Sequence, residues 1–502
     1  MKSCVKTEQL QKSVVWFVVG SQHLYGEETL QQVKRNAEVM ANALNDHLPI
    51  EVVLKPVMTT PGDITSLCQS ANADTDCTGL ILWMHTFSPA KMWLAGLKQL
   101  VKPWCHWHTQ FEQHIPWQTI DMDYMNLHQA AHGDREFASV ASRLRLRRKI
   151  VVGHWKDQST LNEMAVWVRA AMAWADWQDT TIARFGDNMR QVSVTEGDKV
   201  AAQSQFGFSV DGYGVGDLVE VINAASEQDV RQMLQAYADE YEYSASDMDS
   251  VNIKNAARIE AGLRSFLSQG NYKGLTNTFE DLHGLPQLPG ISIQRLMRDG
   301  YGFGAEGDWK TSALLRAAKV MGAGLDGGHS FMEDYTYHFG EDKDLVLGAH
   351  MLEVCESIAS KSTKPQLKIK SLGIGGKEAP VRLIFSVDTG PATMTSLVDL
   401  GDRFRLIVNN VETVECPDLP ELPNARALWE PKPDLKTSAA AWMYSGGAHH
   451  AVFSQSLDQA YYDDFADIAG IEKVAIDQST TIETIKQTLA VNDVIYRGRN
   501  SY

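Results

Sequence analysis

The sequence predicts an α/β protein in which two doubly wound-type α/β domains precede a β-rich, barrel-like C-terminal domain. Three observations lead to this fold class. Short apolar runs alternate with longer amphipathic stretches up to about residue 178. Helical patterns and glycine loops dominate the middle of the chain, and polar–apolar alternation typical of antiparallel strands follows residue 331. We therefore expect domains at residues 1–178, 179–330 and 331–502, in agreement with roughly 150 residues per domain.

In the first domain, four apolar runs predict strands buried on both faces of a parallel sheet: Val14–Val19, Ile50–Leu54, Gly79–Trp83 and Ile150–Val152. Apolar residues at helical spacing predict three covering helices: Glu28–Leu44, Asn126–Leu146 and Ser159–Trp177. Ligands of such sheets bind beyond the carboxyl ends of the strands. The loop Gly20–Gly26, which follows the first strand, is therefore a candidate binding loop.

The later domains follow the same logic. In the middle domain, Gln228–Glu242 and Ile253–Gln269 are predicted helices. In the last domain, Val381–Val387 and Phe404–Val414 are predicted antiparallel strands. Two short helices are expected near the end of the chain, at Asp463–Ala469 and Thr481–Leu489.

The composition limits the partners and the compartment. A net charge of −17 disfavours nucleic acid and anionic membranes, because phosphates would be repelled. The basic run Arg143–Lys149 is interpreted as a solvated helix end. Residues 1–12 contain no apolar core of a signal peptide, and no stretch approaches the ~18 apolar residues of a membrane span. The six scattered cysteines indicate free thiols in a reducing compartment, so we expect a cytoplasmic protein.

Four polar side chains in distinctive surroundings are candidates for one divalent-cation site. Glu306 lies in a glycine-rich segment, and Glu333 follows the apolar pair Phe331-Met332 at what we interpret as a strand end. His350 follows Gly348-Ala349, and the pair His449-His450 follows two glycines. Carboxylates and imidazoles form plausible mixed oxygen and nitrogen sites. The four are spread over 144 residues (450 − 306), so spacing alone does not establish the site.

Each of these features has a second interpretation. The segment Gly302–Gly307 matches the dinucleotide-binding pattern of three glycines, but no apolar strand precedes it, so we favour a bent turn that aims Glu306. Asp308 either caps a helix over Trp309–Met321 or supports a metal ligand, and it could do both. Asp334 is expected to point away from Glu333 and to be structural.

The histidines leave further alternatives. A lone histidine such as His350 is more often a core residue than a ligand. Of the adjacent His449 and His450, only one is expected to face a single metal ion. Glu353 would share a face with His350 on a helix but not on a strand, and the sequence does not decide between them.

Long, order-specific motifs together resemble the L-arabinose isomerase family over nearly the whole chain. They are Trp16–Gly26, Asn126–Gly133, Asn277–Asp281, Gly302–Lys310, Ser330–Tyr335, Gly348–His350 and Gly446–His450. The resemblance implies an aldose–ketose isomerase that converts L-arabinose to L-ribulose and, more slowly, D-galactose to D-tagatose. It implies that Glu306, Glu333, His350 and His450 bind one Mn²⁺ per subunit, with Co²⁺ or Mg²⁺ as substitutes.

The resemblance also implies catalytic roles for Glu306 and Glu333 and a set of sugar-contacting residues. These residues are Gln22, Leu24, Gln129, His132, Met189, Phe279, Phe331, Ile374 and His449. Amides and imidazoles suit sugar hydroxyls, while Phe and Met cover C–H surfaces. The family assembles as homohexamers, whose active sites combine the N-terminal residues of one subunit with the metal site of its neighbour. Three residues in otherwise matching segments differ from those expected in the family: His128, Asp134 and His329. These differences concern the fine substrate preference and not the reaction.

Two mechanisms and several functions remain open at this stage. The two glutamates could move a proton between C1 and C2 through an enediol, or a metal-assisted hydride shift could occur. An L-fucose isomerase-like enzyme is the alternative in the same class. A sugar-binding protein without catalysis is the alternative of another class, disfavoured by the surplus of metal-type ligands, and the glycine pattern alone supports a dehydrogenase.

Overall fold

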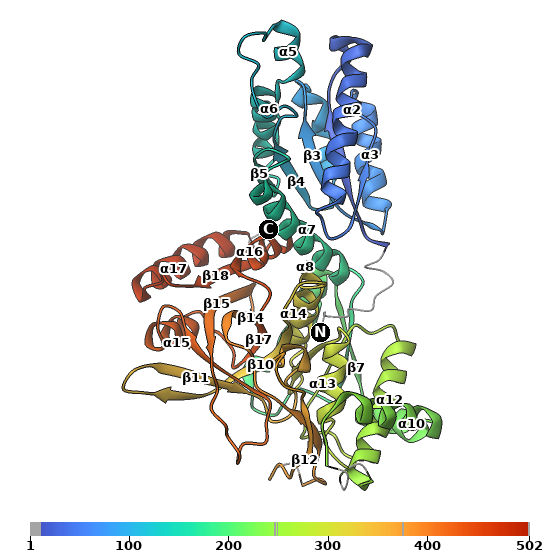
Figure 1. The fold of residues 1–502 in the computed structure, drawn as a ribbon, viewed down its shortest axis with the longest axis vertical. Coiled ribbons are helices and arrows are strands. Elements are labelled where there is room, and N and C mark those ends of the chain that lie inside the picture. The colour runs from blue at the N-terminus through green and yellow to red at the C-terminus, as the bar shows by residue number, and fades with distance from the viewer. Residues whose placement is uncertain (1–11, 245–246, 248, 374–375, 500–502) are drawn as a thin grey trace. The chain divides into compact units, whose positions relative to one another are not determined.

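The computed structural model describes residues 12–244, 247, 249–373 and 376–499 (Figure 1). The chain forms two compact units, residues 7–175 (the N-terminal unit) and residues 176–502 (the C-terminal unit). The predicted sugar contact Ile374 and most of the region expected to lack a signal peptide, residues 1–11, lie outside the described residues. None of the helices in the described part of the chain is long and apolar enough to cross a membrane.

The N-terminal unit contains a five-stranded parallel sheet in the order β2-β1-β3-β4-β5. This order is one of the two common doubly wound arrangements, which confirms the predicted fold of this region. Its strands are β1 (Val14–Gly20), β2 (Glu51–Leu54), β3 (Cys77–Met84), β4 (Trp104–His108) and β5 (Lys149–Val152). Its helices include α2 (Gly26–Asn45), α3 (Pro61–Ala73), α4 (Leu94–Gln99), α5 (Met122–Leu127), α6 (Ala130–Arg143) and α7 (Gln158–Trp177).

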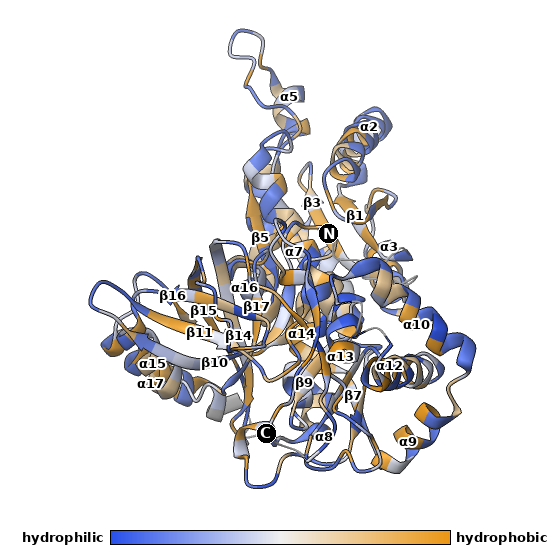
Figure 2. Cartoon of the chain, turned by 60° about the horizontal axis from the view of Figure 1, so that its bottom comes forward, coloured by the Kyte–Doolittle hydropathy of each residue, from blue (hydrophilic) through white to orange (hydrophobic). Residues whose placement is uncertain are grey.

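The predicted strands of this unit lie where expected along the chain, but not all of them are buried on both faces. All eight residues of β3 are buried, as expected of an inner strand. In β5, however, Ile150 and Val152 are 45% and 65% exposed. The prediction of burial on both faces was therefore wrong for β5, because it lies at an edge of the sheet. The helix α2 carries hydrophilic and hydrophobic residues on different sides, as amphipathic spacing predicts (Figure 2).

Two features of this unit were not predicted. The strand β4 was missed because its sequence Trp-Cys-His-Trp-His is not an apolar run. Its two imidazoles are compatible with burial because both contact one buried carboxylate, Asp134: His106 Nε2 at 2.9 Å and His108 Nδ1 at 2.6 Å. The predicted helix Asn126–Leu146 is instead two helices, α5 and α6, because the backbone leaves helical geometry at His128 and Gln129.

The C-terminal unit begins with a four-stranded parallel sheet in the order β7-β6-β8-β9. The strands are β6 (Thr181–Phe185), β7 (Ser209–Tyr213), β8 (Gly274–Asn277) and β9 (Gly302–Ala305). The helices are α8 (Lys199–Phe206), α9 (Val215–Ala224), α10 (Glu227–Glu240), α12 (Val251–Gln269), α13 (Gly290–Arg298) and α14 (Trp309–Met321). Side-chain oxygens of Ser226, Ser250 and Asp308 accept backbone N–H bonds at the starts of α10, α12 and α14, which explains where these helices begin.

The glycine pattern at residues 302–307 has a packing explanation. Gly302 and Gly304 lie in the buried strand β9, against which α14 packs. A Cβ atom at Gly302 would lie 2.0 Å from the carbonyl oxygen of Ser312, and one at Gly304 would lie 2.1 Å from that of Asp308. The two glycines therefore permit the close approach of helix and strand, and no phosphate-binding role is needed to explain them.

Six antiparallel strands then close into a barrel in the order β14-β17-β10-β11-β16-β15, with β15 pairing back to β14. They are β10 (His329–Phe339), β11 (Asp344–Ala349), β14 (Gly390–Asp399), β15 (Phe404–Val414), β16 (Arg426–Pro431) and β17 (His450–Ser454). The strand β18 (Glu472–Ile476) extends the sheet in parallel to β15. The predicted barrel-like domain is confirmed.

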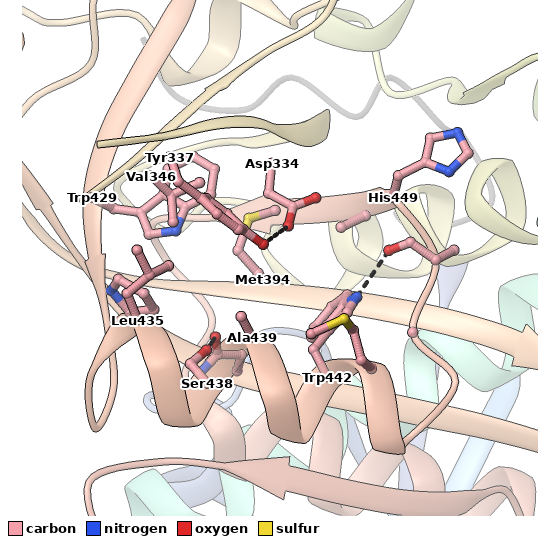
Figure 3. Close-up of a pocket in the computed structure, with 16 residues that line it drawn as sticks. Asp334, Tyr337, Val346, Met394, Trp429, Leu435, Ser438, Ala439, Trp442 and His449 are labelled. Atoms are coloured by element: carbon pink, nitrogen blue, oxygen red, sulfur yellow. Dashed lines mark hydrogen bonds between the residues drawn. The ribbon is translucent and has the colours of Figure 1, made fainter. Parts of the chain in front are cut away.

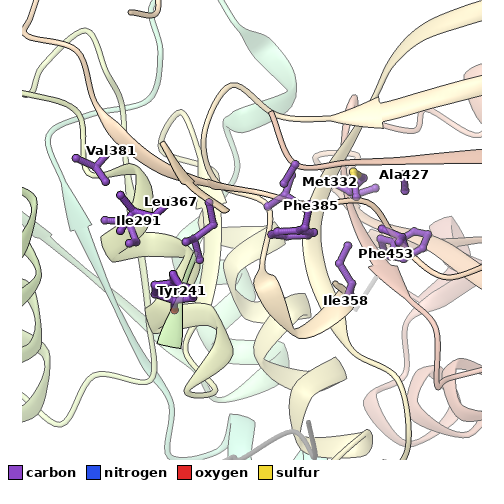
Figure 4. Close-up of a cluster of buried hydrophobic side chains, with 14 of the residues drawn as sticks. Tyr241, Ile291, Met332, Ile358, Leu367, Val381, Phe385, Ala427 and Phe453 are labelled. Atoms are coloured by element: carbon purple, nitrogen blue, oxygen red, sulfur yellow. The ribbon is translucent and has the colours of Figure 1, made fainter. Parts of the chain in front are cut away.

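The remaining elements surround the barrel. The strand β13 (Val381–Ile384) forms a separate two-stranded ladder with β12 (Gln366–Ile369), so the predicted strand Val381–Val387 is shorter than expected. The helices α15 (Leu435–Tyr444), α16 (Gln459–Ala469) and α17 (Ile482–Arg499) complete the chain. One buried apolar cluster runs from Ile291 on α13 to Met332 and Phe453 in the barrel, so helices beside the central sheet share a core with the barrel (Figure 4).

Candidate active site

The barrel register brings the predicted ligands of three different segments side by side. In β10, Glu333 is paired with His450 of β17 on one side and with Ala349 of β11 on the other. His350 follows Ala349 directly, so its imidazole also reaches the same place: Nε2 lies 3.5 Å from Glu333 Oε1. His450 Nε2 lies 3.2 Å from the same oxygen. Glu333 lies inside β10 and not at its end, so the predicted strand end was wrong. Its carboxylate nevertheless lies beside the two imidazoles, and these side chains together form the cluster described below.

The fourth predicted ligand comes from the central sheet. Glu306 follows β9, and its Oε2 lies 3.7 Å from His450 Nε2. Its backbone φ is +59°, a left-handed conformation that is unfavourable for a residue with a Cβ atom. The turn is held by the hydrogen bond from Met189 N–H to the Glu306 carbonyl oxygen, 3.0 Å, and by that from Gly307 N–H to Asn277. This agrees with the interpretation of a bent turn that aims the carboxylate.

Two further carboxylates orient the two buried imidazoles. The Nδ1–H of His450 donates to Asp308 Oδ2 at 3.1 Å, and that of His350 donates to Glu353 Oε2 at 2.6 Å. Each contact leaves Nε2 free to face the cluster, which is the arrangement that carboxylates give to metal-binding histidines. His350 and Glu353 lie in neither helix nor strand but across a bend, and this resolves the alternative that the sequence left open.

Asp308 performs both functions that the sequence suggested. It caps α14 by accepting from Thr311 N–H, and it accepts from His450. Burial opposes its ionisation, but the charge of Lys310, 3.1 Å away, and the His450 hydrogen bond hold the pKa of Asp308 well below its usual value. The carboxylate is therefore a permanent anion that fixes the ring of His450.

The electrostatics of the cluster favour a bound positive charge. Burial lowers the pKa of His450, but the hydrogen bond to Asp308 and the proximity of Glu333 outweigh it and raise the pKa to about 9. Burial opposes the ionisation of Glu333, yet the imidazoles of His350 and His450 lower its pKa overall. Nε2 of His450 is buried without a hydrogen-bond partner, although two carboxylates lie within 4 Å. A buried, unpaired nitrogen beside two carboxylates has the donor chemistry of a divalent-cation site.

His449 lies closer to this cluster than expected. Its Nε2 is 3.6 Å from Glu306 Oε2, and one ligand atom each from Glu306, His449 and His450 lies within 4.8 Å of the others. Both imidazoles thus lie near the Glu306 carboxylate, although only one of them was expected to face a single metal ion. The reason is local: β17 begins at His450, so strand alternation does not force His449 to the opposite side.

Aromatic residues form the apolar part of the site. The ring of Phe331 is fully buried and makes edge contacts with His350 at 4.9 Å and with His450 at 5.0 Å between centroids. Phe279 lines a small cavity together with Glu306 and His350. Among the predicted sugar contacts, Met189, Phe279, Phe331 and His449 thus lie beside the cluster. The sequence suggested the supporting role of Asp308, whereas it left the role of Glu353, whose hydrogen bond orients His350, undecided.

The other predicted sugar contacts belong to the N-terminal unit, where they form a group of their own. Gln22 Nε2 donates to the Phe87 carbonyl oxygen at 2.9 Å, and the His132 ring stacks on Phe87 at 5.1 Å. Gln129 Oε1 accepts from the Tyr25 hydroxyl at 3.1 Å, and Tyr25 directly follows the 82% exposed Leu24 in the loop Gly20–Gly26. The group lies at the carboxyl ends of β1 and β3, where doubly wound sheets bind ligands.

The fold and the site define a class of α/β protein with a doubly wound N-terminal unit, a central parallel sheet and a closed barrel. In this class of protein, two glutamates and two or three histidines form a centre suited to one divalent cation.

Comparison with known proteins identifies the family within this class. The L-arabinose isomerase N-terminal, central and C-terminal domain models match residues 9–179, 181–324 and 328–472. An L-arabinose isomerase from Herpetosiphon aurantiacus is 57% identical over 97% of this chain and 98% of its own length. Those of Serratia proteamaculans and Koribacter versatilis are 54% and 56% identical over 96% and 97% of this chain, each over 98% of its own length. The chain belongs to the L-arabinose isomerase family.

The conformation of Glu306 generates a stability prediction. Glu306→Gly and Glu306→Ala both remove the carboxylate, but only glycine adopts a φ of +59° without steric cost. We expect the glycine variant to be more stable than the alanine variant by about 1 kcal/mol. Thermal and denaturant unfolding of both variants measures the difference. Equal stability would show that the backbone at Glu306 is not strained.

Proposed function

We propose that this protein is an aldose–ketose isomerase that converts L-arabinose to L-ribulose, with slower conversion of D-galactose to D-tagatose. Family membership supports the reaction class, and the two sugars share the configuration at the reacting carbons. The observation that carries the proposal is the convergence of Glu306, Glu333, His350 and His450, from separate segments, around the unpaired His450 Nε2.

The proposal includes one divalent cation, Mn²⁺ by preference, held by Glu306, Glu333, His350 and His450. The donor set fits it, because carboxylate oxygens with one or two imidazoles suit Mn²⁺, and Co²⁺ or Mg²⁺ could substitute. When bound, the cation supplies Lewis-acid stabilisation of the negative charge that develops on the C1 and C2 oxygens of the opened sugar. Asp308 and Glu353 contribute by keeping Nε2 of each histidine free to act as a ligand atom.

The chain's own residues would carry the proton. One of the two glutamates removes the proton from C2 of the open-chain aldose while O1 gains a proton, which gives the enediol. A glutamic acid then returns a proton to C1 while the O2 hydroxyl loses its proton, which gives the ketose. Each glutamate has two carboxylate oxygens, so one can act on the substrate while the other is a ligand atom. Phe331 and Phe279 would exclude water from this step, and His449, which is 43% exposed, would donate to a sugar hydroxyl.

The proposal also includes self-association into a homohexamer. The predicted contacts Gln22, Leu24, Gln129 and His132 would then reach the sugar from a neighbouring subunit. Family resemblance supports this part of the proposal, and a measurement of molar mass in solution tests it.

The assignment of the two glutamates predicts the effect of removing each carboxylate. Glu306→Gln and Glu333→Gln keep size and hydrogen bonding but lose the base, so we expect turnover of L-arabinose to fall by about a thousandfold in each. A ketose assay measures this, with the exposed Glu341→Gln as the control that keeps full activity. Residual activity above a few per cent in either variant would exclude that residue from proton transfer.

The ligand assignment predicts different effects for the two adjacent histidines. Chelation should abolish activity and Mn²⁺ should restore it. His450→Ala removes a buried donor and should weaken Mn²⁺ binding by about a hundredfold or more, whereas His449→Ala should chiefly raise KM or lower turnover. Calorimetric titration with Mn²⁺ separates binding from catalysis. Equal losses of metal affinity in both variants would contradict the assignment and make His449 a ligand.

The proton-transfer mechanism predicts exchange with solvent. In heavy water, a proton held by a glutamate exchanges before it reaches C1, so we expect deuterium at C1 of the ribulose formed. Mass spectrometry or NMR of the product measures it. A product free of deuterium would exclude a solvent-exchanging enediol and favour the hydride shift.

A further inference from the structure

The barrel lumen contains a cavity that is distinct from the cluster described above. Successive residues of a strand point to opposite faces, so Glu333 faces the cluster outside the barrel while Asp334 faces the lumen. An irregularity in the β10–β11 register between Asp334 and Thr336 returns Tyr337 to the same face as Asp334. The cavity has a volume of about 200 Å³. The helix α15 forms one wall of it (Figure 3).

Most polar groups of this cavity already have partners. Ser438 hydroxyl donates to Asn409 Oδ1 at 2.6 Å, and Asn409 Nδ2 donates to backbone carbonyl oxygens, including that of Lys432 at 3.0 Å. Trp442 Nε1–H donates to the Ala448 carbonyl oxygen at 2.9 Å. These groups therefore hold α15 against the barrel and offer little hydrogen bonding to a ligand.

Asp334 is the exception. Among the residues that the structure describes, no side chain forms an ion pair with Asp334, and one side-chain hydroxyl, that of Tyr337, donates a long hydrogen bond of 3.3 Å to it. Figure 3 shows one oxygen of the Asp334 carboxylate at the Tyr337 hydroxyl. A partly buried carboxylate with one long hydrogen bond from a side chain can still accept further hydrogen bonds from a charged group.

The walls of the cavity favour an organic cation. Tyr337, Trp429 and Trp442 present aromatic rings, which attract cations through their π faces, and Val346, Met394 and Leu435 add apolar surface. A sugar would leave several hydroxyls without partners against these walls, at a cost of ~1–3 kcal/mol each. The net charge of −17 also attracts cations and repels anions.

We propose that the barrel lumen is a binding site for a small organic ammonium ion. Its N–H⁺ group would donate to the Asp334 carboxylate, and its hydrocarbon body would lie among Trp429, Trp442 and Met394. A cavity of ~150 Å³ is large enough for benzene, so a six-membered ring that carries one amine fits the space here. The inference does not depend on the proposed isomerase activity.

The position of this site gives it a connection to the cluster. His449 lines the cavity, and its Nε2 lies 3.6 Å from Glu306 Oε2 on the other side. Glu333 and Asp334 are adjacent in the same strand. An ammonium ion in the lumen would therefore contact an imidazole that also borders the candidate metal centre.

Calorimetric titration with cyclohexylammonium tests the proposal on the full-length protein at pH 8, in a buffer free of amines. Cyclohexanol and cyclohexanecarboxylate are the matched probes, because they share the ring and differ in the charge. We expect saturable binding of the cation, at least about tenfold weaker binding of the alcohol, and no binding of the carboxylate. Equal affinities for the cation and the alcohol, or no binding of the cation, would overturn the proposal.

Three variants locate the site. Asp334→Asn should weaken cation binding at least about tenfold, and Ala439→Leu, which fills the lumen from α15, should block it with the carboxylate intact. Asp326→Asn, an acidic residue whose side chain is 92% exposed, should have no effect. Circular dichroism verifies folding, and if Asp334→Asn does not fold, Ala439→Leu decides. Unchanged affinity in a folded Asp334→Asn or Ala439→Leu variant would place the cation elsewhere and refute the lumen site.

Discussion

The register of β10 between β11 and β17 is the constraint on which the candidate site depends. Because Glu333 is paired with His450 and Ala349, two histidines from segments about a hundred residues apart flank one carboxylate. A slip of one residue would turn Glu333 into the lumen and Asp334 outwards, since strand side chains alternate. Closure of the barrel through β14 and β15 makes such a slip costly, because every neighbouring ladder would have to shift with it.

The central sheet contributes the other half of the site through a strained turn and a helix cap. Glu306 is held in a left-handed conformation directly after β9, and Asp308 both starts α14 and binds His450. The glycines at 302 and 304 allow α14 to lie close to β9, so the position of Asp308 is determined by backbone packing. Helices α10, α12 and α13, beside the central sheet, share an apolar core with the barrel, and this core holds the two halves of the site together.

Charge is distributed unequally across the wall of the barrel. Outside, carboxylates and imidazoles concentrate around His450, and the unpaired nitrogen there is compatible with a cation. Inside, one carboxylate faces aromatic rings with little competing polarity. Both arrangements place an anion in partly buried surroundings, where a positive partner is more stabilising than it would be in bulk solvent. The two proposals for β10 therefore both involve a cation, a divalent ion on its outer face and an organic ammonium ion in the lumen.

Local pattern in the sequence was sufficient for many elements of this fold. The helix Trp309–Met321 and the strand Phe404–Val414 have the predicted bounds, because a capping aspartate and a strand-like run of polar and apolar residues are local signals in the sequence. Sequence motifs alone likewise identified the four candidate metal ligands, Glu306, Glu333, His350 and His450. Tertiary structure alone decided the closure of the barrel, the approach of His449 to Glu306, the support of His350 by Glu353, and the burial of β4 around Asp134. Each of these depends on which distant segments pair or on how the chain bends locally, and no short stretch of sequence contains that information.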